Sequence, residues 1–303
     1  MADFNAIQQE IAQLKKEKNA LILAHYYVPI EVQDVADKVG DSFALAKFAK
    51  SASEDVIVMC GVRFMGESAK ILSPDKTVLL PAEDAGCPMA DMITPEGVME
   101  HRRNHPEAAV VCYVNSSAAV KAVSDICCTS SSALKVVEAL GEKEVIFVPD
   151  KNLGSYVAEK TGEKAFHVHN GYCPMHNRLE AEEVLKLKAE HPEALVAVHP
   201  ECQQEILDHA DFIGSTADIL DFAAKSDYKE MIIGTEVEIA KILSRKYPEK
   251  KFYTASENFT CGDMKKITLE ALRDCLKYGK YEVKLTDEEI AGARRSLDRM
   301  VSI

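Results

Sequence analysis

The sequence lacks the features of a membrane or secreted protein. None of its apolar runs is long enough to cross a bilayer, and its first twenty residues, MADFNAIQQEIAQLKKEKNA, are charged and amphipathic, without the apolar core of a signal peptide. Positive charge is scarce: 36 lysines and arginines stand against 49 aspartates and glutamates, a net charge of −13. This balance argues against nucleic acid or an anionic membrane as a partner. We therefore expect a cytoplasmic protein that acts on small molecules.

The chain also lacks closely paired cysteines. It has nine cysteines, and no two of them form a CxxC pair, the spacing typical of structural zinc sites. Disulfides are unusual in the cytoplasm, so the default for each thiol is a small, buried side chain. We expect this default for six of the nine: Cys60, Cys112, Cys127, Cys128, Cys202 and Cys275.

Three stretches of the chain share one pattern. They are DKVGDSFALAKFA at 37–49, DICCTSSSALKVV at 125–137 and DFIGSTADILDFA at 211–223, offset by 88 and 86 residues. Each begins with Asp, has a small residue at its fourth position, and continues with the apolar spacing of a helix. The sixth position of each carries a hydroxyl: Ser42, Ser130 and Thr216. The sequence therefore contains an internal repeat of about 87 residues.

The repeat extends in both directions as strands and helices. Short apolar runs precede each shared stretch (LILAH, VVCY, LVAVH), and others follow it (DVIVMC, EVIFVP, EMIIG), then a helical segment and a further strand. Such runs are typical of buried parallel strands. The pattern predicts an α/β protein of three similar Rossmann-like αβα sandwich domains, arranged with pseudo-threefold symmetry around a central cavity. We expect the domains at 1–84, joined by the C-terminal 264–303, at 85–170 and at 171–263.

Three cysteines occupy equivalent positions of this repeat. Cys87, Cys173 and Cys261 each follow the last strand of a unit, at offsets of 86 and 88 residues. Three thiolates from separate loops could bind zinc or an iron–sulfur cluster. His176, three residues after Cys173, makes a Cys3His zinc site a real alternative. The absence of an obvious fourth ligand instead fits a [4Fe–4S] cluster with one open iron, which can act as a Lewis acid.

Polar groups recur at the ends of the first strands. His25, Tyr113 and His199 occupy one equivalent position, and Tyr27, Asn115 and Glu201 follow two residues later. Because ligands of parallel α/β sheets bind beyond the carboxyl ends of the strands, we expect these side chains to face the central cavity. The hydroxyls of Ser42, Ser130 and Thr216 are expected at helix starts, where anions bind readily.

At this point the chain resembles the quinolinate synthase family over essentially its whole length. The resemblance rests on several motifs: ILAHYY (22–27), GDS (40–42), CPMA (87–90), YVNSS (113–117), CTSSSA (128–133), GYCPMH (171–176), VHPEC (198–202), GST (214–216), IGTE (233–236) and the late Cys261. It implies an oxygen-sensitive [4Fe–4S] cluster held by Cys87, Cys173 and Cys261. It also implies condensation of iminoaspartate with dihydroxyacetone phosphate to quinolinate, phosphate and water, in the biosynthesis of NAD.

The resemblance also implies roles for other residues. Ser42, Ser130, Ser215 and Thr216 would bind a phosphate or a carboxylate, and Asn115 would hydrogen-bond a carboxylate. Tyr113 and His199 would orient the intermediate. His25, Tyr27 and Glu201 would transfer protons during enolisation, ring closure and dehydration. A transient contact with the enzyme that produces iminoaspartate is a further possible interaction.

Two other classes of protein compete with this interpretation. A non-catalytic iron–sulfur carrier or sensor would be better served by four cysteines, and it would have no need of aligned hydroxyls and strand-end histidines. A small-molecule binding protein with structural zinc is the second alternative. Metal analysis separates the alternatives, because zinc without sulfide would favour the binding protein.

Overall fold

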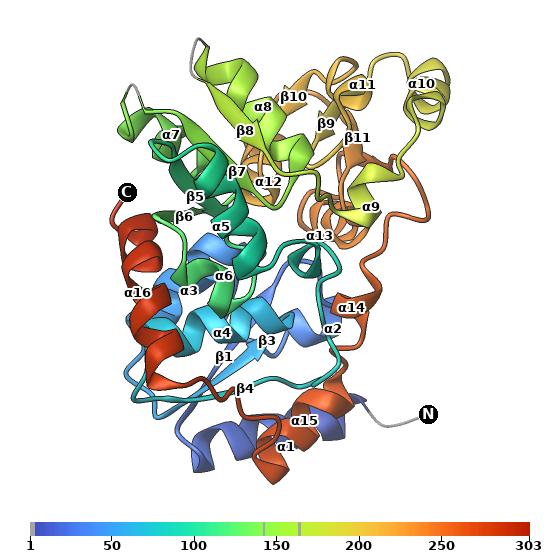
Figure 1. The fold of residues 1–303 in the computed structure, drawn as a ribbon. Helices are drawn as coiled ribbons and strands as arrows, with labels where there is room; N and C mark the ends of the chain where they lie inside the picture. The colour runs from blue at the N-terminus through green and yellow to red at the C-terminus, as the bar shows by residue number, and fades with distance from the viewer. Residues whose placement is uncertain (1–3, 142, 163–164) are drawn as a thin grey trace.

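Three parallel β-sheets form the framework of the protein (Figure 1). The structure is a computed structural model that describes residues 4–141, 143–162 and 165–303. Each sheet has four strands, and in each the second strand along the chain lies at one edge, followed in space by the first, third and fourth. This identical order confirms the predicted α/β triplication. In open sheets of this topology, ligands generally bind beyond the carboxyl ends of the first and third strands, because the connections on the two sides of this pair run in opposite directions.

The first sheet has the order β2-β1-β3-β4. Its strands are β1 (Ala20–His25), β2 (Lys38–Gly40), β3 (Val56–Cys60) and β4 (Thr77–Leu79). The helices of this part of the chain are α1 (Phe4–Glu17), α2 (Ile30–Gln33), α3 (Ser42–Lys50) and α4 (Arg63–Leu72). The central strands β1 and β3 are almost entirely buried, as expected for a sheet covered by helices on both faces.

The second sheet repeats this arrangement with the order β6-β5-β7-β8. Its strands are β5 (Ala109–Tyr113), β6 (Ile126–Cys128), β7 (Val145–Val148) and β8 (Phe166–Val168). The helical segments are η1 (Ala90–Met92), α5 (Pro95–Asn104), α6 (Ala118–Ala122), α7 (Ala133–Ala139) and α8 (Lys151–Thr161). Ser130, expected at a helix start, lies in the turn three residues before α7.

The third sheet has the order β10-β9-β11-β12. Its strands are β9 (Leu195–Val198), β10 (Phe212–Ile213), β11 (Glu230–Gly234) and β12 (Lys251–Thr254). The helices are α9 (Pro174–Asn177), α10 (Ala181–Glu190), α11 (Gln204–Leu207), α12 (Thr216–Lys225) and α13 (Glu238–Lys246). The second strands of the three units, β2, β6 and β10, have only two or three residues and each lies at an edge of its sheet.

The aspartate that begins each shared stretch explains part of the repeat. Asp37 donates its backbone N–H to Ile22 O and accepts the Ile22 N–H with its carboxylate, at 2.9 and 2.8 Å. Asp125 makes the same pair of bonds with Val110, and Asp211 with Val196. The carboxylate thus satisfies a backbone donor of the central strand just where the edge strand begins. The repeated Asp therefore has a structural role, because it links the start of the edge strand to the neighbouring central strand.

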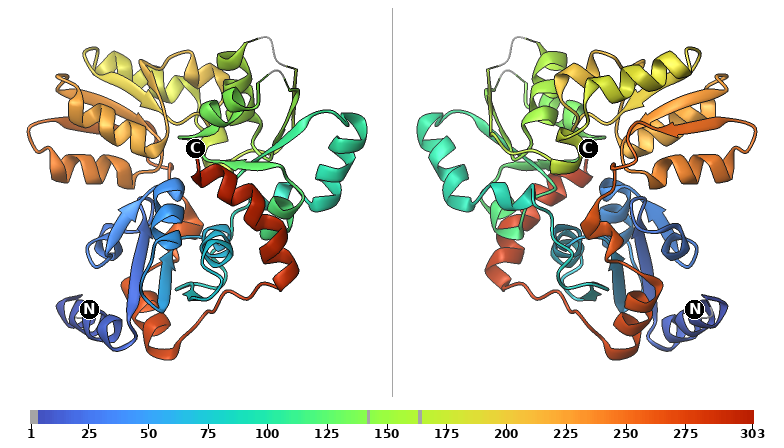
Figure 2. Two further views of the ribbon diagram at one scale, coloured as in Figure 1. Left: turned by 90° about the vertical axis from the view of Figure 1, so that its left-hand side faces the viewer. Right: turned by 90° about the vertical axis from the view of Figure 1, so that its right-hand side faces the viewer.

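The C-terminal segment connects the first two units (Figures 1 and 2). It contains α14 (Gly262–Lys265), α15 (Leu269–Tyr278) and α16 (Asp287–Val301). Helix α15 packs on α1, whereas α16 packs on α4 and also on α6 and β6 of the second unit. A Cβ atom at Gly292 would lie 2.8 Å from the Ala122 side chain, so glycine permits the close approach of α16 to α6. The exact domain boundaries stay a prediction: 84 and 170 fall in loops, whereas 263 falls inside α14.

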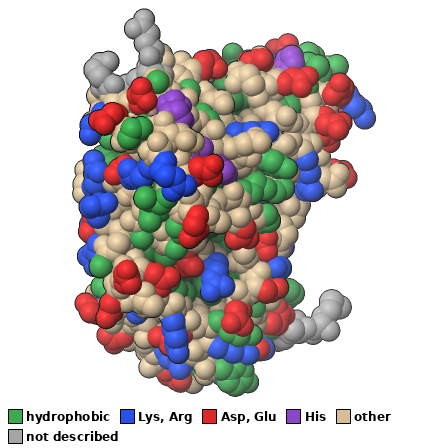
Figure 3. Space-filling model, in the orientation of Figure 1, with side chains coloured by type: hydrophobic (Ala, Val, Ile, Leu, Met, Phe, Trp, Pro, Cys, Tyr) green, Lys and Arg blue, Asp and Glu red, His purple; other side chains and the backbone are tan. Residues whose placement is uncertain are grey.

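The surface mixes charges of both signs. Figure 3 shows acidic and basic side chains interspersed over the face in view. Within the part of the chain that the structure describes, no helix combines the length and the apolar character needed to span a bilayer.

Candidate active site

Residues from all three units line one cavity of about 230 Å³. The lining includes twelve residues singled out from the sequence: His25, Tyr27, Ser42, Cys87, Tyr113, Asn115, Ser130, Cys173, His199, Glu201, Thr216 and Cys261. The strand ends of β1, β5 and β9 supply the imidazoles of His25 and His199 and the Tyr113 phenol. Loops after the last strand of each unit supply the cysteines. The repeat therefore brings residues that are distant in sequence to one place.

Ser215 differs from the other expected residues. It is the N-cap of α12, and its hydroxyl accepts the Asp218 N–H and bonds to the Asp218 carboxylate in a capping box. It does not belong to the cavity lining described above. A direct contact between Ser215 and a ligand stays a prediction, and the structure gives this side chain a local structural role.

The three cysteines of equivalent position differ from the other six in exposure. Cys87, Cys173 and Cys261 are partly exposed, whereas the remaining six are buried, and none of the nine forms a disulfide. Cys173 and Cys261 are the N-caps of α9 and α14. Burial is the main cause that raises the pKa of all three thiols, that of Cys87 to about 12. A metal ion would reverse this preference because it binds the thiolate form. Three accessible thiols at one cavity thus fit a soft metal group.

His176 bears on the zinc alternative. Ligand atoms of Cys173, His176 and Glu201 lie within 4.8 Å of one another. However, His176 Nδ1 lies 2.7 Å from Glu201 Oε2, and its Nε2 lies 3.0 Å from Thr235 Oγ1. Both ring nitrogens are therefore occupied by protein partners. This arrangement favours a positioning role for His176 next to the cysteine.

The two strand-end imidazoles share one geometry. His25 Nδ1 accepts the backbone N–H of Tyr27 at 3.1 Å, and His199 Nδ1 accepts that of Glu201 at 3.3 Å. An imidazole that accepts at Nδ1 carries its proton on Nε2. His199 Nε2 accordingly donates to Ser130 Oγ, 3.2 Å away. Burial lowers the pKa of both histidines to about 3, against the attraction of Glu201. Both are therefore neutral donors at pH 7.

Glu201 connects the second and third units. Its Oε1 accepts the Tyr113 hydroxyl at 2.7 Å, and its Oε2 accepts His176 Nδ1 at 2.7 Å. Burial alone would raise the pKa of this carboxyl, but the neighbouring His176 and His199 and the two hydrogen bonds outweigh burial and lower it to about 2. Glu201 is therefore an ionised carboxylate held inside the protein.

Tyr27 connects the first and third units. Its hydroxyl lies 2.8 Å from Thr216 Oγ1 and 2.7 Å from Thr235 Oγ1, so it positions the Thr216 hydroxyl at the cavity. Burial raises the pKa of Tyr27 well above its usual value, which keeps the phenol protonated.

The Asn115 carboxamide has an unused acceptor, because its Oδ1 is buried and has no hydrogen-bond partner. Such an atom is available to a ligand that donates a hydrogen bond.

Two buried acidic residues next to the cysteine loops were not predicted as site residues from the sequence. Asp150 accepts the Cys173 N–H at 3.1 Å, and Glu236 accepts the Cys261 N–H at 3.4 Å. They follow β7 and β11 at equivalent positions, 86 residues apart, in the runs EVIFVPD and EMIIGTE. This equivalence was the signal that could have revealed them. Each carboxylate fixes the backbone of the cysteine in the loop that follows.

Arg178 was also missed. It is the one lysine or arginine among the described residues that line the cavity, and its guanidinium donates to the carbonyl of Asn258, near Cys261. Arg178 is an exposed residue at the C-terminal end of the short helix α9, and nothing in the sequence distinguishes it from other surface arginines. Its position at the rim makes it the natural partner for a ligand carboxylate or phosphate.

Three parallel α/β units around a cavity that combines thiols, imidazoles and a carboxylate define an α/β enzyme built from three repeats. Residues 9–302 match the family model described as "Quinolinate synthetase A protein", and the chain belongs to this family.

Individual relatives agree with this assignment. The chain is 50% identical to "Quinolinate synthase" of Caldicellulosiruptor saccharolyticus over 301 residues, 99% of both chains. It is 52% identical to "Quinolinate synthase 2" of Methanosarcina acetivorans, over 98% of this chain and 96% of the relative. It is also 52% identical to "Quinolinate synthase" of Geobacter metallireducens, over 99% and 98% of the two chains.

The neutral histidines predict a loss of stability in acid. Because the folded pKa of His25 and His199 is about 3 and that of an unfolded histidine about 6.5, only the unfolded chain gains these protons between pH 7 and 5. Their contribution to stability is full above pH 6.5 and falls by about 2 kcal/mol per histidine at pH 5. Urea unfolding at both pH values measures this loss. Between pH 7 and pH 5, the free energy of unfolding of His199→Gln should fall by about 2 kcal/mol less than that of the parent. An equal fall in both proteins would contradict burial of His199 in its neutral form.

Proposed function

We propose that this chain condenses iminoaspartate with dihydroxyacetone phosphate to give quinolinate, phosphate and two molecules of water, in the biosynthesis of NAD. The observation that carries the proposal is the meeting of three thiols of equivalent position with the strand-end imidazoles and Glu201 in one cavity. The names of the relatives at about half identity support the same reaction. We propose the cytoplasm as its location.

Cys87, Cys173 and Cys261 would hold a [4Fe–4S] cluster. Bound there, the cluster would leave one iron without a protein ligand, and that iron would supply Lewis-acid chemistry for loss of water. Asp150 and Glu236 support this assignment, because they fix the backbone of two of the three cysteines. Among the described residues, these three cysteines line the cavity and no fourth cysteine does. Three thiolates are the set of protein ligands that a cluster with one open iron requires.

Neutral imidazoles would bind the oxygen atoms of the substrates. His25 and His199 both present Nε2–H, and a neutral imidazole can polarise a carbonyl without giving up its proton. His25 would assist enolisation of the ketone, and His199, which is hydrogen-bonded to Ser130, would orient the intermediate together with Tyr113.

Glu201 is the strongest candidate for proton transfer. It is an ionised carboxylate at the cavity, hydrogen-bonded to Tyr113 and His176, so a proton that it accepts from a substrate carbon can be returned to a leaving hydroxyl. The Tyr27 hydroxyl already makes two hydrogen bonds to threonines, which suits a relay or positioning group.

The anionic groups of the substrates would meet uncharged donors and one cation. Ser42, Ser130 and Thr216 would bind the phosphate or a carboxylate, with Arg178 at the rim. Asn115 would contact a substrate carboxylate through its amide nitrogen and accept a hydrogen bond at its unpartnered Oδ1. Local donors of this kind allow an acidic protein to bind anions.

The direct test supplies both substrates to the protein purified and assayed without oxygen. Iminoaspartate is unstable and should be generated in the assay by an aspartate-oxidising enzyme, the class of reaction that must precede this one. The expected result is quinolinate and phosphate in equal amounts. A protein that contains iron and sulfide but releases neither product would instead support a carrier or sensor.

Replacing Ser130 by alanine tests the phosphate contact. Loss of one hydrogen bond to a charged group costs about 1.5–3 kcal/mol, so we expect the KM for dihydroxyacetone phosphate to rise about 10- to 100-fold, with a smaller change in kcat. Steady-state kinetics at saturating iminoaspartate measure it. Ser124→Ala is the matched control, because Ser124 is buried in the same unit, bonds to Val120 O and does not line the cavity. An unchanged KM in Ser130→Ala would remove Ser130 from the phosphate site.

A further inference from the structure

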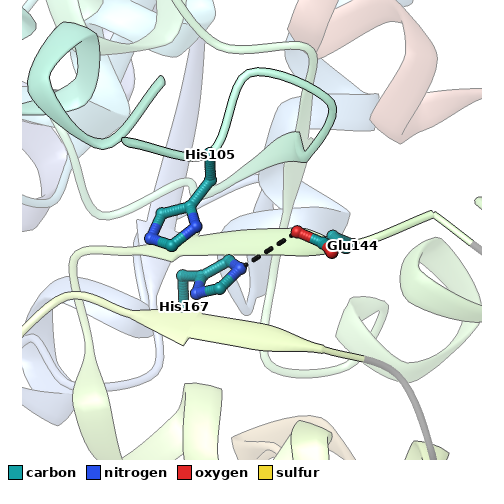
Figure 4. Close-up of side chains that lie close together, drawn as sticks. All are labelled: His105, Glu144 and His167. Carbon is teal, nitrogen blue, oxygen red and sulfur yellow. Dashed lines mark hydrogen bonds and ion pairs between the residues drawn. The ribbon is translucent and has the colours of Figure 1, made fainter. Parts of the chain in front are cut away.

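A second group of potential metal ligands lies outside the central cavity. Figure 4 shows His105, Glu144 and His167, with the rings of the two histidines face to face and Glu144 beside them. His105 is the C-cap of α5, Glu144 directly precedes β7, and His167 belongs to the edge strand β8. None of the three lines the central cavity. Any ligand bound here is therefore separate from the chemistry proposed above.

The three side chains are close enough to share one ion. Their ligand atoms lie within 4.8 Å of one another. His167 Nε2 is 3.2 Å from Glu144 Oε2, and the imidazole centroids of His105 and His167 are 3.3 Å apart with 16° between the planes. A second pair lies alongside: His101 Nε2 is 3.1 Å from His169 Nδ1, and His169 Nε2 is 2.9 Å from Met92 O. That second pair is satisfied by its own hydrogen bonds.

The third unit provides an internal comparison. His191, Glu230 and Tyr253 stand 86 residues after His105, Glu144 and His167. His191 stacks on Tyr253 at 3.8 Å and 15°, and the Tyr253 hydroxyl donates to Glu230 at 3.1 Å. A ring stacked on a ring beside a carboxylate is thus a structural feature of the repeat. On this basis alone, the group in the second unit would need no ligand.

Two differences separate the units. The second unit has the imidazole of His167 where the third has a phenol. The third also has Lys251, which neutralises Glu230 at 3.1 Å, where the second has Ala165. The third unit therefore supplies its own cation to the carboxylate. At these two positions the second unit has an imidazole in place of the phenol and alanine in place of the lysine, and its carboxylate lies beside two imidazoles.

We propose that His105, Glu144 and His167 form a binding site for a divalent cation of the zinc class. Two imidazoles and a carboxylate are the ligand set of many zinc sites, and water would complete the tetrahedron. The C-terminus of α5, where His105 lies, adds a partial negative charge that favours a cation. The side chains of Glu144 and His167 are 49% and 24% exposed, so an ion can enter from solvent.

Binding requires a small local movement. Ligands about 2.0–2.1 Å from a tetrahedral zinc are about 3.4 Å from each other, so atoms now up to 4.8 Å apart must draw together and the stacked rings must turn. The bound ion would then connect the end of α5 to β8 and to the start of β7. Its role would be structural, as a cross-link of the edge strand.

The test measures zinc bound to the parent and to His167→Tyr. This change reproduces in the second unit the histidine–tyrosine stack of the third unit, so it should keep the fold while it removes a metal ligand. Protein with its iron–sulfur cluster in place is dialysed without oxygen against buffered zinc, and bound zinc is determined by elemental analysis. We expect the parent to hold one more zinc per chain than His167→Tyr. Equal zinc contents would overturn the proposal, because zinc bound at cysteines is common to both proteins.

Two further measurements sharpen the result. Zinc, but not magnesium, should raise the thermal unfolding temperature of the parent and of the control His191→Gln, and it should leave His167→Tyr unchanged. The double change Tyr253→His with Lys251→Ala builds the same ligand set in the third unit and should add a second zinc. A stabilisation that persists in His167→Tyr, or a double variant that gains no zinc, would overturn the assignment to these three positions.

Discussion

Alanine in place of any one of Cys87, Cys173 and Cys261 is expected to remove the cluster and to reduce quinolinate formation to the assay background. The three thiols are the only cysteines that line the cavity among the described residues. Burial raises the pKa of each thiol, so the three thiols stay protonated when no metal is bound. Binding therefore depends on all three thiolates together. Loss of one leaves two ligands, too few to retain a cubane cluster.

The measurement is iron and acid-labile sulfide in protein purified without oxygen. We expect about four of each per chain in the parent, and little of either in the three variants. Cys202→Ala is the control, because Cys202 adjoins Glu201 in sequence but is fully buried and donates to Gly234 O. It should keep its cluster. Zinc without sulfide in the parent, or a cluster that survives one of the three changes, would contradict the assignment of the ligands.

Glu201→Gln is expected to leave the cluster in place and to lower kcat by about 10²–10⁴-fold, the usual contribution of a general acid or base. The amide has nearly the size of the carboxylate but cannot take up a proton at neutral pH. It also replaces one acceptor by a donor, although Tyr113 and His176 both donate to Glu201. One of these hydrogen bonds must therefore be lost.

Single-turnover kinetics with a count of iron and sulfide separate the two effects. Glu67→Gln is the matched control: Glu67 is another buried carboxylate, which accepts the Ala118 N–H, and it does not line the cavity. An amide oxygen can accept that bond equally well, so activity should persist. Near-normal turnover in Glu201→Gln would show that Glu201 has no role in proton transfer.

The strands and the cysteine-bearing loops could be predicted because their signals are local and occur three times. The run LILAH became β1, and its equivalents became β5 and β9, so His25, Tyr113 and His199 were correctly placed at strand ends. The edge strands β2, β6 and β10 were missed, although they lie inside the shared stretches. Two or three residues are too few to show an alternating pattern.

Other features of the site depend on contacts between units, which a single sequence does not reveal. Nothing in the chain near Tyr27 indicates that its hydroxyl meets Thr216 and Thr235, some two hundred residues away. The same holds for Arg178 at the rim of the cavity. Asp150 and Glu236 are an intermediate case, since their equivalence was visible in the sequence but their hydrogen bonds to the cysteine loops were not.

The fusion of three units into one chain permits an asymmetry that separate subunits would forbid. In a ring of three identical subunits, every substitution near the axis is made three times at once. Here the equivalent positions differ: His25 and His199 flank Tyr113, and Tyr27, Asn115 and Glu201 supply a phenol, an amide and a carboxylate. The two unlike substrates that we propose would need unlike partners on each side. A chain of three fused units can keep three identical cysteines while each of its other positions differs independently.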